Sequence, residues 1–145
     1  MIDGVVVKDA FEVVDTRGSV QRMVRADDDS LFAGFGEIYF STTNPGVVKA
    51  WHRQASRTNV LSCVRGMIRL VLYDARGGSK THGALEELEM GDGLRKVVRV
   101  PPGVIYGWRN SGDVAAILAN CASEPHNPDA SEKIDPGSSL VPYVW

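Results

Sequence analysis

The residue in this sequence best suited to chemistry is His52, in the stretch GVVKAWHRQASRTNVLSCVRG, residues 46–66, whose flanks are typical of β-strands. A histidine here can accept a proton near pH 7, because its unperturbed pKa of about 6.5 leaves much of it neutral. It can also bind a metal ion, or simply fill a hole in the core. The surrounding residues and the elements that hold them decide between these roles.

The elements around His52 are predicted to be strands. Fifteen glycines and seven prolines separate short runs rich in Val, Ile, Tyr and Phe, a pattern typical of an all-β sandwich or barrel. The predicted strands cover residues 36–43, 58–66, 67–74, 95–103 and 115–123. Only GALEELEMGD, residues 83–92, has a pattern that could form a turn or two of helix.

Length and composition fit one globular domain over residues 1–145. The formal net charge of −2 gives no broad basic field, so nucleic acid is not expected as a partner. No stretch approaches the ~20 apolar residues of a membrane span, and the N-terminus lacks a secretion signal, so we expect no membrane partner and a cytoplasmic protein. Residues from about 123 to 145 form a polar tail, and its apolar end VPYVW predicts that the tail is anchored.

Two stretches resemble the motifs of the cupin superfamily. The spacing from Gly46 to Gly66 resembles the first motif, and residues 101–110 resemble the second, which implies an all-β, cupin-type jelly-roll barrel with the tail folded over it. The positions that bind metal in metal-dependent cupins contain only one good donor here: they are His52, Gln54, Asn59 and Tyr106. Neutral amides and a protonated tyrosine are poor ligands, so no metal site or other cofactor is expected.

Five blocks together resemble the dTDP-4-dehydrorhamnose 3,5-epimerase family. They are VDTRG at 14–18, GVVKAWHRQ at 46–54, VLYDARGGSKTHG at 71–83, VPPGVIYGW at 100–108 and IDP at 134–136. Members are metal-free cupins that epimerise nucleotide-linked 4-keto-6-deoxy sugars. The resemblance therefore implies a nucleotide-sugar substrate, dTDP-linked, and a homodimer.

The resemblance also implies roles for individual residues. His52 matches the catalytic base, and Asp135 matches the aspartate that pairs with it. Such a carboxylate fixes the histidine tautomer and stabilises the imidazolium once it forms. Arg17 matches an arginine that binds the nucleotide diphosphate, Lys49 takes the place of a substrate-binding arginine, and Gln54 closes the histidine motif.

At other positions the sequence departs from the family. Asn59 replaces a lysine that stabilises the enolate, and no tyrosine lies near residues 124–125, where the family has its general acid. Tyr106, which replaces a second histidine, is the preferred substitute for that acid. Tyr39 is the next choice, since it alternates with Glu37 and Ser41 on one strand face. Lys49, Arg53 or Arg76 could replace the lysine.

These departures leave several readings open. The chain could epimerise one carbon only, or bind a sugar nucleotide without catalysing its conversion. Less favourably, it could act as a metal-dependent cupin enzyme. Arg76 could instead form a salt bridge with Asp74, and Asp135, which precedes Pro136, could instead serve simply to initiate a turn. His82 and His126 lie in turn-like, solvent-exposed surroundings and are assigned no role.

Overall fold

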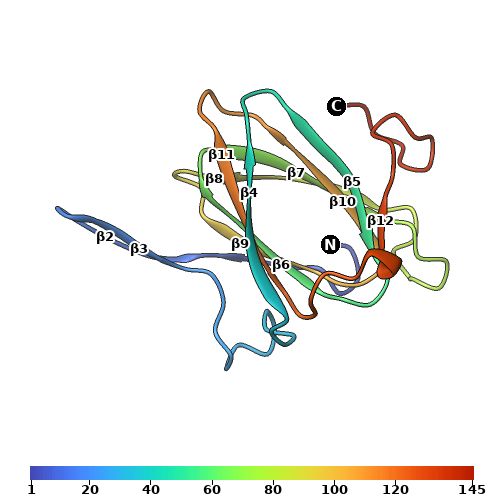
Figure 1. Cartoon of the computed structure of the whole chain (residues 1–145), viewed down its shortest axis with the longest axis horizontal. Coiled ribbons are helices and arrows are strands. Elements are labelled where there is room, and N and C mark those ends of the chain that lie inside the picture. The colour runs from blue at the N-terminus through green and yellow to red at the C-terminus, as the bar shows by residue number, and fades with distance from the viewer.

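Two antiparallel sheets of five strands face each other across one core (Figure 1). The computed structural model describes all residues 1–145. The first sheet contains, in order, β1 (Val6–Asp9), β9 (Lys96–Val100), β6 (Asn59–Arg65), β11 (Ala116–Ala122) and β4 (Glu37–Thr43). The second contains β12 (Ser131–Lys133), β5 (Val48–Gln54), β10 (Val104–Asn110), β7 (Met67–Asp74) and β8 (Leu85–Gly91). The all-β prediction is confirmed.

The main core fills the space between the sheets with alternate residues of their strands. Along β7, Ile68, Leu70 and Leu72 are fully buried and face inward, two residues apart as strand geometry requires. The turn or two of helix considered possible within residues 83–92 does not form. That stretch forms β8, because β7 supplies its hydrogen-bond partners along its full length and Leu88 and Met90 then pack on the core.

No helix in the structure is long and apolar enough to cross a membrane. The single helical element is a 3-10 turn, η1 (Pro128–Ala130), which begins the C-terminal tail.

The alternation of β5 sends neighbouring side chains to opposite faces of the second sheet. Trp51 is fully buried on the outer face, where it packs with Val71, Ile105 and Val141 in a cluster separate from the main core. His52 therefore faces the space between the two sheets.

The tail folds back over the second sheet and covers Trp51. Strand β12 pairs antiparallel with β5, so that Lys133 lies opposite His52. Beyond it, the rings of Tyr143 and Trp145 lie 5.9 Å and 4.8 Å from the ring of Trp51. The apolar end of the chain is anchored, as its sequence indicates.

A hairpin of β2 (Phe11–Asp15) and β3 (Gly18–Arg22) projects from the body of the molecule (Figure 1). It pairs with no strand of either five-stranded sheet.

The close approach of β10 to β5 leads to a test of stability. A Cβ atom on Gly107 would lie 2.5 Å from the Ala50 Cβ and 3.0 Å from the Trp51 ring, so Gly107→Ala forces the two strands apart. We expect a loss of about 1–3 kcal/mol in the free energy of unfolding, measured with urea. Gly77→Ala is the control, because no atom lies within 4 Å of its added Cβ. Equal stability of the two variants would contradict this account of the β5–β10 contact.

Candidate active site

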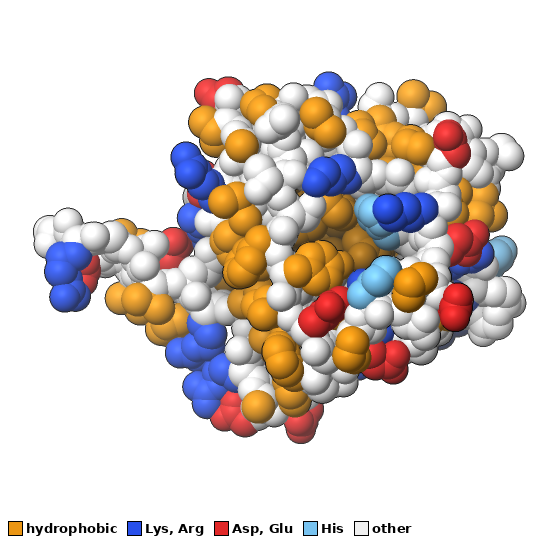
Figure 2. Space-filling view, in the orientation of Figure 1, with side chains coloured by type: hydrophobic (Ala, Val, Ile, Leu, Met, Phe, Trp, Pro, Cys, Tyr) orange, Lys and Arg blue, Asp and Glu red, His pale blue; other side chains and the backbone are white.

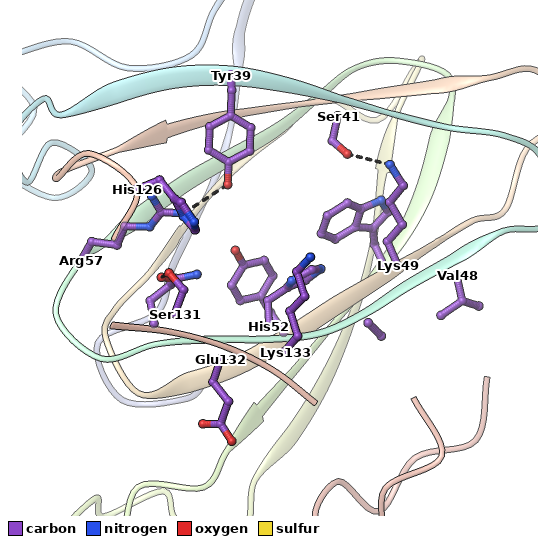
Figure 3. A pocket seen from close by; sticks show the side chains of 14 residues that line it. Tyr39, Ser41, Val48, Lys49, His52, Arg57, His126, Ser131, Glu132 and Lys133 are labelled. Atoms are coloured by element: carbon purple, nitrogen blue, oxygen red, sulfur yellow. Dashed lines mark hydrogen bonds between the residues drawn. The ribbon is translucent and has the colours of Figure 1, made fainter. Parts of the chain in front are cut away.

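A cavity of about 460 Å³ lies between β4, at the edge of the first sheet, and β5, β10 and β12 of the second (Figure 3). Its volume suits a small-molecule ligand. Lysine, arginine and histidine side chains gather around the hollow in Figure 2, with apolar side chains at its floor. The cavity thus offers both basic groups and apolar surface to a ligand.

His52 lines this cavity from β5 and is held between aromatic rings. Its ring centroid lies 5.3 Å from that of Trp108, in a stacked arrangement, and 5.4 Å from that of Tyr106. Trp108 is itself fixed, because its Nε1 donates to Thr43 Oγ1 at 2.9 Å. The Nε2 atom of His52 is buried and has no hydrogen-bond partner. A buried polar atom without a partner is costly, and such atoms mark positions that a ligand can satisfy.

Burial, together with the smaller effects of the ammonium groups of Lys133 and Lys49, lowers the pKa of His52 to about 4. The backbone carbonyl of Lys49 acts in the opposite direction and raises it. His52 is therefore neutral at pH 7 and keeps a free lone pair. A negatively charged ligand in the cavity would offset the two lysines and stabilise the imidazolium that forms on protonation.

Tyr39 reaches the cavity from the opposite sheet. Its hydroxyl accepts hydrogen bonds from Asn120 Nδ2 at 2.7 Å and from Arg57 Nη2 at 3.4 Å. Arg57 is 5% exposed and donates from Nη1 to Glu37 Oε1 at 2.9 Å. The alternation of Glu37, Tyr39 and Ser41 predicted from the sequence places Tyr39 and Ser41 in the cavity lining.

Tyr106 also lines the cavity, and its hydroxyl accepts from Asn59 Nδ2 at 3.2 Å. Burial raises the pKa of Tyr106 above its ordinary value. Asn59 does not reach the cavity surface. It is buried, and its Oδ1 accepts from Asn120 Nδ2 of the same sheet at 3.0 Å, so that its bond to Tyr106 is the one that connects the two sheets.

Lys49 and Gln54, both predicted to bind substrate, lie in the cavity lining. The Lys49 ammonium donates to Ser41 Oγ at 2.9 Å and to the Thr42 carbonyl at 2.7 Å. Gln54 is largely buried, and its Oε1 accepts from Ser131 Oγ at 2.7 Å. Gln54 thus ties the tail strand to β5 at the cavity wall.

The predicted pairing of Asp135 with His52 is wrong. The Asp135 side chain is exposed, and its Oδ1 accepts from the backbone N–H of Gly137 at 2.7 Å, as in a turn initiator. It lies outside the cavity lining, since the β12 register puts Lys133 opposite His52 and sends the chain on past the pocket.

Three predicted arginines also lie outside the cavity within this chain. Arg76 forms an ion pair with Asp74 at 2.8 Å and donates to the Asp3 carbonyl, so the salt-bridge alternative is the correct one. This contact raises the pKa of Arg76 and lowers that of Asp74. Arg17 lies in the turn of the projecting hairpin, paired with Asp15 at 2.6 Å. Arg53 pairs with Glu132.

Three basic residues of the cavity lining were assigned no role from the sequence: Arg57, His126 and Lys133 (Figure 3). His126 comes from the segment after β11; it is exposed, as its turn-like composition suggested, and it also lines the cavity. Lys133 lies two residues before Asp135, in a strand too short to be recognised from its pattern. Only the pairing of β12 with β5 brings it to the cavity.

The likeness to known proteins extends over the whole chain. A family model described as dTDP-4-dehydrorhamnose 3,5-epimerase matches residues 1–145. The chain belongs to this family. Its members are sugar-nucleotide epimerases, that is, isomerases that work without a metal ion. In this chain, no group of three or more His, Cys, Asp or Glu side chains is arranged to hold a metal.

Relatives in this family are similar along most of their length. The chain is 34% identical over 133 residues to the spore coat polysaccharide biosynthesis protein SpsL of Bacillus subtilis, covering 92% of this chain and 87% of SpsL. It is 32% identical over 143 residues to Agl13 of Haloferax volcanii, a probable low-salt glycan biosynthesis epimerase, covering 98% and 88%. A crystal structure of a dTDP sugar isomerase from Desulfovibrio desulfuricans superposes with a TM-score of 0.95 at 35% identity, covering 99% and 92%.

The charges around His52 lead to a titration test. Lys133→Met removes one nearby ammonium group, so the pKa of His52 should rise from about 4, as followed by the NMR signals of its ring protons. Lys80→Met, which removes an exposed lysine paired with Asp3, should leave it unchanged. An unchanged or lower pKa in Lys133→Met would contradict the assignment.

The same shift affects stability. Because the pKa of His52 is lower in the folded than in the unfolded chain, the unfolded chain binds more protons between about pH 6.5 and 4. The contribution of His52 to folding is thus present above pH 6.5 and lost as the pH falls towards 4.

Proposed function

We propose that this protein epimerises a nucleotide-linked 4-keto-6-deoxy sugar, dTDP-linked, with His52 as the base. The observation that carries the proposal is the imidazole itself: it is neutral, it lines a cavity rich in cations, and its Nε2 has no partner in the protein. A hydrogen on the carbon beside a ketone is acidic enough to be removed by such a base when the resulting enolate is stabilised.

The cations around His52 would supply that stabilisation. The enolate develops negative charge on the ketone oxygen, and a positioned donor at such an oxygen contributes about 3 kcal/mol. Lys133 is the best-placed candidate, because it exerts the largest charge effect on His52. The Lys49 ammonium is already bonded to Ser41 and Thr42 and can bind the substrate without moving. Lys133 thus takes the role that Asn59 cannot fill.

The relatives support a place in glycan assembly. SpsL is named for spore coat polysaccharide biosynthesis, and Agl13 for glycan biosynthesis. We propose the same general setting for the sugar made by this protein. Its cytoplasmic location stays a prediction.

The projecting hairpin supports a homodimer. Phe11, Val13, Val14 and Val20 are exposed on it, and Ile38 and Phe40 are exposed on the outer face of β4. Figure 2 shows apolar side chains on the projecting hairpin and on the neighbouring body of the molecule. A second copy whose hairpin packs against β4 would cover both surfaces. Since β4 also carries Tyr39 on its cavity face, this packing would bring Arg17 of one copy towards the cavity of the other. There the arginine could bind the diphosphate, the role that the family resemblance implies for it.

Hydrogen exchange tests the proposed chemistry. In D₂O, the native protein should introduce deuterium beside the ketone of a dTDP-linked 4-keto-6-deoxy sugar, and His52→Asn should lower the rate at least ~100-fold. His82→Asn is the control, because His82 lies outside the cavity. NMR also counts the labelled carbons, so one deuterium identifies a single-carbon epimerase. Saturable binding of the sugar nucleotide without any exchange would indicate a non-catalytic binding protein and refute the proposal.

Molar mass in solution tests the dimer. Val20→Asp places a charge on the exposed apolar face of the hairpin, so light scattering should change from the mass of two chains to that of one. Val144→Asp, at a position 93% exposed in the tail, should remain dimeric. A native protein that has the mass of one chain would exclude the hairpin interface.

A further inference from the structure

We propose that Tyr39 is the residue that returns the proton, from the face of the sugar opposite to His52. The inference rests on the proposed function and names the second catalytic group of the same site. It replaces Tyr106, which the sequence alone favours.

Epimerisation requires the two groups to be on opposite sides of the reacting carbon. His52 removes the proton from one side, and inversion results only if the new proton arrives from the other. His52 belongs to β5 of the second sheet, and Tyr39 belongs to β4 of the first. Figure 3 shows the Tyr39 hydroxyl pointing into the cavity from β4, towards the strand that carries His52. A sugar ring bound between the sheets would have one group on each face.

The hydrogen bonds of Tyr39 leave its own proton available. A phenol oxygen has two acceptor sites and one donor hydrogen. Asn120 and Arg57 donate into the acceptor sites at 2.7 Å and 3.4 Å. No acceptor in the protein receives the hydroxyl hydrogen, so it can point into the cavity towards a ligand.

Arg57 also suits the state that follows proton transfer. Once Tyr39 has given up its proton it carries a negative charge, and a buried guanidinium beside that oxygen stabilises it. Glu37 holds the guanidinium in place through Nη1. Asn120 is opposite Tyr39 in the β11–β4 ladder and keeps the hydroxyl in a fixed position. Arg57 and Asn120 thus act as positioning residues.

Tyr106 is on the wrong side for this task. It is directly opposite His52 in the β10–β5 ladder, in the same sheet, with its ring 5.4 Å from the imidazole. From there it supports the His52 ring and contacts the same face of a bound sugar. His126 also lines the cavity, but no hydrogen bond fixes its side chain.

The proposed steps balance in protons and charge. His52 takes the proton from the carbon beside the ketone, and the C–H electron pair moves to form the enolate. The enolate then collapses to the ketone as its carbon bonds to the Tyr39 proton on the other face. This leaves a Tyr39 phenolate and a His52 imidazolium, and proton exchange with water restores both.

Comparing deuterium exchange with inversion separates the two roles. In D₂O, Tyr39→Phe should still incorporate deuterium through His52, with the original configuration retained, while the rate of inverted product falls at least ~100-fold. Tyr106→Phe should lower exchange and inversion together, because it disturbs the His52 ring. Tyr73→Phe, outside the cavity, is the matched control and should change neither.

Other outcomes would overturn the assignment. They are inversion by Tyr39→Phe at a near-native rate, loss of exchange and inversion together in that variant, or selective loss of inversion in Tyr106→Phe or His126→Gln. Arg57→Gln should lower the rate of inversion in the native protein but cause no further loss when combined with Tyr39→Phe. A urea titration checks that each variant folds. If native protein shows no exchange at all, the proposed function fails and not merely the choice of acid.

Discussion

The site depends on how β5 is held. Its alternation sends Trp51 outward and His52 inward, and each side chain is fixed by a different part of the chain. Trp51 is buried under the aromatic end of the tail, while His52 is stacked on Trp108. Because both anchors act on one strand, the packing of the C-terminus on the outer face sets the orientation of the imidazole on the inner face. Stability and chemistry are coupled through a single backbone segment.

The charges around the cavity favour an anionic ligand. His52 is neutral because it is buried beside two ammonium groups, and that arrangement makes its protonation costly. A substrate that brings negative charge, as a diphosphate and then as an enolate, reverses this cost. The cavity is therefore suited to an anionic ligand, and the base gains a stable protonated form only when such a ligand is bound. This physical logic fits the sugar-nucleotide epimerase family to which the chain belongs.

A buried hydrogen-bond network joins the two sheets behind the cavity. It runs from Tyr106 through Asn59 and Asn120 to Tyr39. Asparagines suit this position, since an amide nitrogen carries two hydrogens: Asn120 donates to Tyr39 and to Asn59, and Asn59 donates to Tyr106. The network holds one tyrosine on each sheet. Because the two side chains have the same chemistry, their proposed roles differ only through the sheet from which each one reaches the cavity.

The sequence by itself indicated an all-β fold, several of its strands and His52 as the candidate base. Strand periodicity, turn residues and motif spacing are local or nearly local signals, so they can be read along the chain. Strand β8 was not predicted, because pairing with β7 outweighs local preference there, and neither were short strands such as β1 and β12. Tertiary structure alone decided which side chains share the cavity. Lys133 reaches His52 through the register of a three-residue strand, and Asp135 misses it for the same reason. Arg57 and His126 enter from segments without a strand pattern, since cavity membership depends on where the two sheets leave a gap and not on any periodic signal.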